Sequence, residues 1–210
     1  MPIASINHPS RKTKFESARI PLSFGLGLVW VGFLISTKAQ GFESAVYDFV
    51  ELGGFFLIFV AVLGRLWATL YIGGRKDSQL CTTGPYSLTR NPLYLFSFLG
   101  VVGVCLAAQN LILTGITALL FLAYYHVIIR KEETRLREMF GVAWEDYATR
   151  VPRFLPRWQG PDTADVVEVN VRIFTRSLGD VGWFLVAIIA IELVEDMRID
   201  GVLGGWVLPY

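Results

Sequence analysis

Long hydrophobic runs alternate with polar segments along the chain of 210 residues. The runs are Ile20 to Thr37, Phe49 to Ile72, Pro92 to Ala108, Leu111 to Ile129 and Val181 to Val194. About 20 consecutive apolar residues suffice for a helix to cross the hydrocarbon layer of a bilayer. The pattern therefore predicts an all-α, polytopic membrane protein with about five transmembrane helices in a single domain.

Within this domain, residues 20–72 hold the first two spans and residues 73–156 hold a core. Residues 157–210 form a cytoplasmic loop and a C-terminal hydrophobic helix. The polar, turn-rich stretch from Arg157 to Thr175 predicts an ordered loop or a surface strand. Val181 to Val194 would measure only about 21 Å as a helix, so it is short for a crossing. We expect a fifth span there, with a re-entrant or surface helix as the alternative.

Gln109-Asn110 is the only polar break between the third and fourth runs. Two spans joined by so short a connection form a tight helical hairpin, which returns the chain to the side it came from. The segment around Arg90 and the segment around Glu132 are therefore expected to meet on one face of the membrane.

Positive charges indicate which face this is. If the N-terminus is inside, the cytoplasmic segments hold all but three of the 19 Lys and Arg residues, the exceptions being Lys38, Arg65 and Arg198. The positive-inside rule then places the N-terminus and the shared face in the cytoplasm. Arg65 lies inside the second run, where it either snorkels toward the cytoplasm or lines a pocket.

An amphipathic helix is expected after the hairpin. Its apolar positions recur at spacings of three and four residues and are Leu136, Phe140, Ala143 and Tyr147. Pro152 and Pro156 would end it. Such a helix either lies on the membrane surface or acts as a lid over a bound cofactor.

Composition narrows the function. The hydrophobic share is 53%, the mean hydropathy is +0.49 and the net charge is only +1, so nucleic acid is not an expected partner. Cys81 falls in a predicted cytoplasmic loop and Cys105 in a span, which argues against a disulfide framework. With His8 and His126 as the only histidines, we expect no metal.

Two polar segments carry the candidate chemistry. The first reads Thr83-Gly-Pro-Tyr-Ser-Leu-Thr-Arg-Asn-Pro-Leu-Tyr94, with a turn at Gly84-Pro85 and a proline suited to a first helical turn. Its Arg90 would lie at the start of a membrane helix, where the helix dipole favours an anionic group. The alternative is that Arg90 only marks the cytoplasmic boundary.

The second segment contains Glu132-Glu133, Phe140-Gly141 and later Arg150-Val-Pro. Adjacent glutamates on a helix point about 100° apart, so we expect one to face a pocket and the other to face water. Together, the two segments resemble the integral-membrane methyltransferases that include isoprenylcysteine carboxyl methyltransferase and the phospholipid N-methyltransferases. The resemblance covers about Gly64 to Pro156.

The resemblance implies that S-adenosylmethionine is the cofactor and that a lipophilic small molecule or lipid is the acceptor. The cofactor-binding positions that it implies are Ser78, Gln79, Leu80, Cys81, Tyr86, Asn91, Pro92, Leu93, Tyr94 and Glu132. Arg90 and Glu133 would orient the cofactor or the acceptor, and His126 or Glu133 would assist an acceptor that must lose a proton.

Two positions depart from the family pattern. Asn91 stands where the family has a histidine, and an amide cannot titrate near neutral pH. Ile128 stands where the prenylcysteine enzymes have an arginine that holds the substrate carboxylate, so a prenylcysteine is a poor candidate acceptor. The alternative functions are an NADPH-dependent reductase of the sterol-reductase type and a non-catalytic membrane scaffold. The oligomeric state is left open.

Overall fold

The computed structural model describes residues 32, 37–39, 45–75, 78–157, 159–163, 165–202 and 206–208. Apart from Gly32 and Thr37, the first predicted span lies outside these residues. The elements are β1 (Thr37–Ala39), α2 (Ala45–Ile72), the 3₁₀ helix η1 (Gly84–Ser87), α3 (Pro92–Ala107), α4 (Leu111–Phe140), α5 (Val142–Arg150), α6 (Val171–Ile199) and β2 (Trp206–Leu208). The predicted helical fold is confirmed, and the sequence did not predict β1 and β2, which form one short parallel pair.

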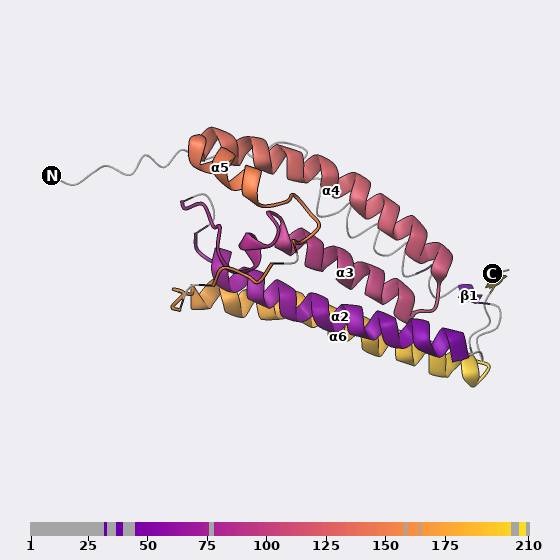
Figure 1. The fold of residues 1–210 in the computed structure, drawn as a ribbon. Helices are drawn as coiled ribbons and strands as arrows, with labels where there is room; N and C mark the ends of the chain where they lie inside the picture. Colours follow the sequence, from indigo (N-terminus) through magenta and orange to yellow (C-terminus); the bar gives the residue numbers. More distant parts are fainter. Residues whose placement is uncertain are drawn as a thin grey trace, which may run out of the picture.

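Three helices, α2, α3 and α6, lie side by side along most of their length (Figure 1). Glycines allow α2 and α3 to approach closely: a Cβ on Gly54 would lie 2.3 Å from the backbone nitrogen of Ala107. Small residues at such contacts are typical of membrane helix pairs. Ile191 of α6 packs into the same core, which contains the fully buried Ile58 of α2.

The predicted hairpin between α3 and α4 is present. Gln109 adopts a left-handed conformation with φ of 53°, which reverses the chain within two residues. Asn110 then caps α4, because its side-chain oxygen accepts a hydrogen bond from the backbone N–H of Leu113. From this turn α4 runs back toward the end of the bundle where α3 begins (Figure 1).

The predicted amphipathic helix is wrong in its extent. Helix α4 has 30 residues in total and ends only at Phe140. Gly141, with φ of 50°, separates it from α5. The phase of the apolar stripe also differs, because Trp144 is buried while Ala143 is exposed. Leu136 and Phe140 of α4 therefore pack against Trp144 and Tyr147 of α5 as a small core between two helices.

Helix α6 begins at Val171, so the predicted loop or surface strand ends earlier than expected. Its 29 residues correspond to about 43 Å, which removes the difficulty of a short final span. Among the described residues, three helical segments are long and apolar enough to cross a membrane: Asp48–Ile72, Leu111–Phe140 and Val171–Met197. Helix α3, with 16 residues, is shorter.

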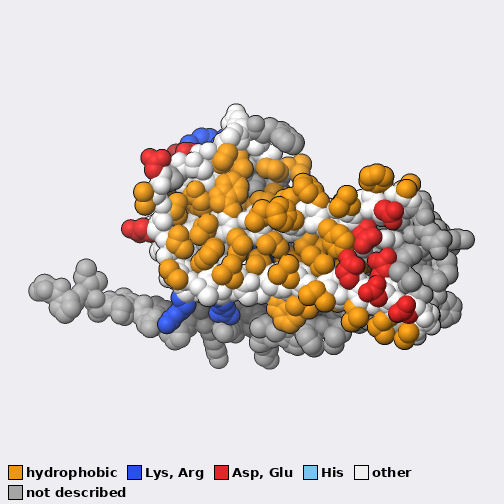
Figure 2. Space-filling view, turned by 90° about the horizontal axis from the view of Figure 1, so that it is seen from below, with side chains coloured by type: hydrophobic (Ala, Val, Ile, Leu, Met, Phe, Trp, Pro, Cys, Tyr) orange, Lys and Arg blue, Asp and Glu red, His pale blue; other side chains and the backbone are white. Residues whose placement is uncertain are grey.

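Apolar side chains cover the middle of the face formed by α2 and α6 (Figure 2). On these two helices, Trp183 of α6 and Phe49 of α2 are 73% and 74% exposed. Such broad apolar exposure is expected where lipid is the solvent. Arg65, seven residues before the end of α2, donates a hydrogen bond to the hydroxyl of Ser97 on α3, so its guanidinium contacts the neighbouring helix. The structure is thus that of an integral membrane protein.

Candidate functional site

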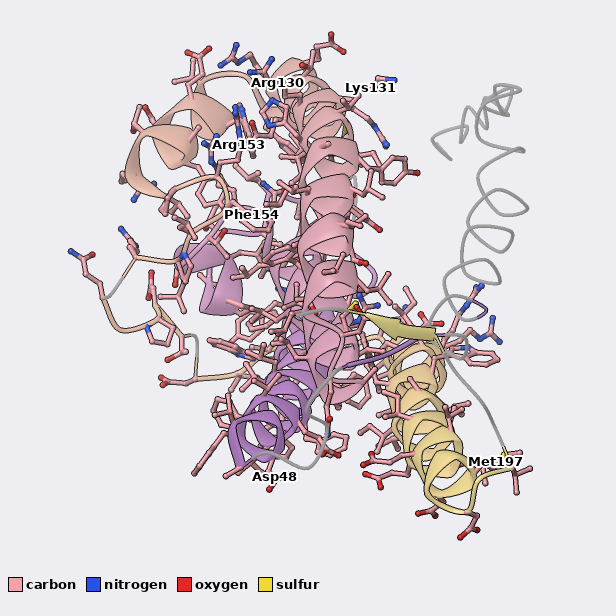
Figure 3. The ribbon with its side chains drawn as sticks, turned by 90° about the vertical axis from the view of Figure 1, so that its right-hand side faces the viewer. Asp48, Arg130, Lys131, Arg153, Phe154 and Met197 are labelled. Atoms are coloured by element: carbon pink, nitrogen blue, oxygen red, sulfur yellow. The ribbon has the colours of Figure 1, made fainter. Side chains whose placement is uncertain are left out.

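The site forms at one end of the bundle, where α3 begins and α4 ends. Arg153 and Phe154, in the segment after α5, lie at this end together with Arg130 and Lys131 (Figure 3). Asp48 and Met197 lie at the opposite end of the molecule. The expected convergence of the two polar segments is therefore realised.

The turn before α3 is held rigidly. Gly84, with φ of 60°, packs directly against the ring of Tyr71, where a Cβ would lie only 2.4 Å from the ring. Tyr86 is buried on η1, and its carbonyl accepts a hydrogen bond of 2.7 Å from the Tyr147 hydroxyl on α5. The backbone N–H of Gly84 also donates to the carbonyl of Asp162 at 2.6 Å. These contacts fix Tyr86 against α5.

Arg90 is placed just before the start of α3, as the sequence predicted. Its backbone N–H donates to the carbonyl of Pro152 at 2.9 Å, and its guanidinium lies 5.8 Å from the centre of the Trp144 ring. One guanidinium nitrogen forms an ion pair of 3.3 Å with Glu133, and the side chain is only 13% exposed. Buried contacts therefore orient the Arg90 guanidinium.

Glu133 is the most enclosed carboxylate of this end. Besides Arg90, it binds Arg153, whose Nη2 and Nε lie 2.7 and 2.9 Å from the second carboxylate oxygen. Asn91 donates to the carbonyl of Arg153 at 2.9 Å and lies 3.5 Å from Glu133. We expected one of the paired glutamates to face a pocket and the other to face water. The second part is wrong, because Glu133 is only 7% exposed. Its rotational position on α4 directs it into the contact with α3 and the segment after α5.

Glu132 is half-buried and lies at a cavity between η1, α3, α4 and α5. The hydroxyl of Tyr94 donates to one of its carboxylate oxygens at 2.7 Å. The cavity has a volume of about 160 Å³. Its walls consist of Ile72, Gln79, Leu80, Cys81, Tyr86, Arg90, Asn91, Pro92, Leu93, Tyr94, Glu132, Leu136, Trp144 and Tyr147.

Ten of the thirteen residues predicted for the site lie in these walls. The other three do not: Ser78 is exposed and donates to the carbonyl of Arg75, Glu133 lies behind Arg90, and His126 is exposed on α4. The sequence did not predict four further wall residues, Ile72, Leu136, Trp144 and Tyr147. Trp144 could have been found, because the spacing from Leu136 through Phe140 to Trp144 is also helical.

Two residues of the cavity wall each carry a buried hydrogen-bond donor that has no acceptor among the described residues. The hydroxyl of Tyr86 and the Nε of Arg90 have no hydrogen-bond partner among the described residues. Burial raises the pKa of the Tyr86 phenol well above its ordinary value, so this group is a protonated donor at neutral pH. Buried polar groups are normally satisfied, so these two atoms make Tyr86 and Arg90 candidate donors to a polar ligand.

The same cavity offers little for covalent catalysis. Burial raises the pKa of the Cys81 thiol, which disfavours the thiolate that acts as nucleophile. Burial also raises the pKa of the Tyr147 phenol, whose proton is held by the Tyr86 carbonyl. The walls are therefore suited to binding and orienting a ligand by hydrogen bonds, charge and aromatic contact.

The fold and the cavity define an integral membrane protein with a partly open cavity, lined by apolar and polar side chains, at one end of a helical bundle. The chain belongs to the phospholipid methyltransferase family, whose family model matches residues 21–143. This match includes the start of α3 and the paired glutamates of α4, and it confirms the family that the sequence motifs indicated. No solved structure matches the chain.

Three curated proteins are similar to this chain. It is 41% identical to the nickel-cobalt-cadmium resistance protein NccN of Alcaligenes xylosoxydans xylosoxydans, over 79% of the chain and 77% of that protein. It is 38% identical to the cobalt-zinc-cadmium resistance protein CzcN of Cupriavidus metallidurans, over 69% of the chain and 66% of that protein. The protein-S-isoprenylcysteine O-methyltransferase of Schizosaccharomyces pombe is 27% identical, over 59% of the chain and 53% of that enzyme.

Proposed function

We propose that this chain transfers a methyl group from S-adenosylmethionine to a lipophilic or membrane-associated small acceptor bearing a carboxylate, a thiol or an amine. The observation that carries the proposal is the convergence of Glu132, Tyr86 and Arg90 on one cavity, where the Tyr86 hydroxyl and the Arg90 Nε have no hydrogen-bond partner among the described residues. The family supplies the expectation of this chemistry, since one relative is named as a methyltransferase.

The donor set fits the cofactor. The half-buried carboxylate of Glu132 suits an ammonium or a ribose hydroxyl, while Arg90 and Tyr86 suit acceptor atoms such as carboxylate oxygens. The rings of Trp144 and Tyr86 offer flat apolar surface and can also interact with a cation. The cofactor, when bound, supplies an electrophilic methyl group on a sulfonium.

The role of the protein is mainly to position the reactants. Holding two reactants in line can contribute about 7–11 kcal/mol of barrier reduction without covalent chemistry. Arg90 is suited to this role because Glu133 and Trp144 hold its guanidinium in place. The buried walls around Tyr86 and Asn91 also limit the access of water, which strengthens their polar interactions with a ligand.

The chemical class of the methyl acceptor depends on which side chains of the protein can take up a proton. An amine or a thiol must lose a proton during methylation, whereas a carboxylate needs no base. Of the two candidate bases, His126 lies outside the cavity walls, and the carboxylate of Glu133 forms ion pairs with two arginines. This arrangement favours an acceptor that arrives already ionised, such as a carboxylate.

Cofactor entry would require local movement. Ligand pockets usually have volumes of about 300–1,000 Å³, and the present cavity is smaller, at about 160 Å³. Gln79, at the cavity, and its neighbour Ser78 are exposed. Leu80 and Cys81, in contrast, pack against the buried side chains around Trp144 and Tyr86. We propose that Ser78 and Gln79 move outward when the cofactor binds.

Calorimetry with the purified protein tests the proposal. S-adenosylmethionine should bind to the wild type, and replacing Glu132 with Gln should weaken binding by about 1–3 kcal/mol, the usual range for hydrogen bonds to charged groups. Glu138→Gln, at an exposed position of the same helix, removes an equal charge and should bind as the wild type does. Binding of NADPH instead would favour the reductase alternative, and binding of neither cofactor would favour the scaffold.

We also propose that this methyl transfer contributes to tolerance of divalent metals. The similarity to two proteins named for metal resistance, at 41% and 38% identity, favours this role. A host strain lacking the chain should grow less well on nickel, cobalt or cadmium. Wild-type protein should restore growth and the Glu132→Gln variant should not, whereas equal restoration by both would separate metal tolerance from the cofactor site.

A further inference from the structure

The chain after α5 passes the turn that precedes α3 (Figure 1) and is bonded to it. Arg157 donates from its backbone N–H to the carbonyl of Leu88 at 3.1 Å and from its Nε to the carbonyl of Ser87 at 2.9 Å. The backbone N–H of Asp162 donates to the Ser87 hydroxyl, also at 2.9 Å. Two stretches that are far apart in the sequence therefore lie side by side at the candidate site.

Thr89, in the same turn, is fully buried although its side chain is polar. Its hydroxyl donates to the carbonyl of Phe154 at 3.0 Å, and the carbonyl of Arg153 lies 3.3 Å from the same oxygen. This oxygen also accepts the backbone N–H of Asn91 at 3.4 Å. A threonine hydroxyl can both donate and accept, and here it does both. One side chain thus joins the turn to the segment after α5.

The hydrogen bonds of Thr89 belong to a closed ring of contacts around Arg90. The backbone N–H of Arg90 donates to the carbonyl of Pro152, and its guanidinium pairs with one carboxylate oxygen of Glu133. Arg153, which follows Pro152, pairs with the other oxygen of Glu133. The main chain and the side chain of Arg90 are therefore both fixed by the short stretch that Thr89 holds.

We propose that Thr89 is a positioning residue for methyl transfer, because it ties the segment after α5 to the turn and so orients Arg90 at the cavity. The inference rests on the proposed function, since it gives this tie a role in binding S-adenosylmethionine. Thr89 does not line the cavity, whereas the two residues that follow it, Arg90 and Asn91, do. Its effect on a ligand is therefore transmitted through these two neighbours.

Removing the Thr89 hydroxyl isolates this effect. Valine is close to threonine in shape but can neither donate nor accept a hydrogen bond. Thr89→Val would leave the carbonyl of Phe154 and the N–H of Asn91 without this partner, so the segment after α5 would be free to shift from the turn. Thr89→Ser keeps the hydroxyl and should preserve the tie.

Hydrogen–deuterium exchange of the purified protein without cofactor tests the tie. The N–H groups of Arg90 and Asn91 are bonded to Pro152 and to Thr89 itself, so in Thr89→Val they should exchange at least about fivefold faster than in the wild type. Thr89→Ser should exchange as the wild type does. Should Thr89→Val not accumulate, Thr89→Ala removes the same hydroxyl without adding volume.

Thr114→Val is the matched control. The hydroxyl of Thr114 donates to the carbonyl of Asn110 at 2.8 Å in the first turn of α4, at the other end of the hairpin. Its removal costs a comparable hydrogen bond but should leave the exchange of Arg90 and Asn91 unchanged. Unchanged exchange in Thr89→Val, or equally fast exchange in Thr89→Ser, would overturn the tie.

Calorimetry with S-adenosylmethionine tests the role in binding. Thr89→Val should bind the cofactor at least about fivefold more weakly, whereas Thr89→Ser and Thr114→Val should match the wild type. Faster exchange in Thr89→Val with unchanged cofactor affinity would show a structural tie alone and overturn the positioning role. If the wild type itself does not bind S-adenosylmethionine, the methyl-transfer proposal fails together with the role in binding, and the exchange rates still test the tie on their own.

Discussion

Replacing Glu133 with Gln tests how the candidate site is held together. The substitution keeps the shape of the side chain and removes its negative charge. In the native protein this charge is only 7% exposed and faces two cations, Arg90 at 3.3 Å and Arg153 at 2.7 Å. The variant leaves both guanidiniums without their anion, and Arg90 is too enclosed to recover the interaction from water.

The expected cost follows from this burial. Removing one partner of a buried ion pair typically costs about 3–5 kcal/mol, because the remaining charge is left uncompensated. Arg153 is 42% exposed and can turn to water, so we expect the lower end, about 3 kcal/mol. For a chain of 150–250 residues this corresponds to a melting temperature lower by about 6–12 °C.

A cysteine buried in the bundle provides the assay. Cys105 is fully buried, so a thiol-reactive fluorophore would label it only as the protein unfolds. The measurement is made in a Cys81→Ser background, because Cys81 is half-buried and would give early signal. Glu145→Gln is the control: its pair with Arg137 is long, at 3.7 Å, and exposed, so the loss should stay within about 1 kcal/mol. If Glu133→Gln melts together with Glu145→Gln, the network does not support the site as argued.

Three further outcomes are expected. Arg90→Lys should accumulate normally yet lose at least about tenfold in kcat/KM, because a lysine cannot pair with a carboxylate and present a second donor in one fixed plane; full activity would return Arg90 to the role of a boundary charge. Gly54→Ala should destabilise the fold by about 1–3 kcal/mol or more, since the new methyl would lie 2.3 Å from the backbone of α3, whereas Gly53→Ala meets no described atom within 4 Å and should melt near the wild type. A cysteine at Arg157 should require a membrane-permeant reagent for labelling, while one at Lys38 should label from outside; labelling of both from outside would refute the predicted orientation.

The sequence could predict the site because its location depends on chain direction alone. Two helices joined by Gln109-Asn110 must be antiparallel, so the start of one and the end of the other must meet. That reasoning placed Arg90 beside the paired glutamates without any knowledge of side-chain contacts. It could not tell which glutamate enters the cavity, because the rotational phase of α4 depends on its packing against α3 and α5.

Other features escaped because their signals are weak or distant in sequence. The positive φ of Gly141 divides α4 from α5, and a single glycine in an apolar periodic stretch does not reveal whether the helix continues. The sequence predicts a start of α6 that is too late in the chain, because Arg172 and Arg176 interrupt the apolar pattern of its first turns. The packing of Ile191 of α6 against the core around Ile58 of α2 joins residues far apart in the chain, which no local pattern contains.

The charges of α6 bear on whether this helix crosses the membrane or lies along its surface. A surface helix would carry charged residues along one whole side. Instead, Arg172, Arg176 and Asp180 lie in its first three turns, and Glu192, Glu195 and Asp196 lie near its end. The apolar part between them includes Trp183, which is 73% exposed, and the candidate span of 27 residues measures about 40 Å, more than the roughly 30 Å of hydrocarbon. Cations at the cavity end and anions at the other end fit a crossing whose basic side is cytoplasmic, which is the side that the methyl-transfer proposal requires for a water-soluble cofactor.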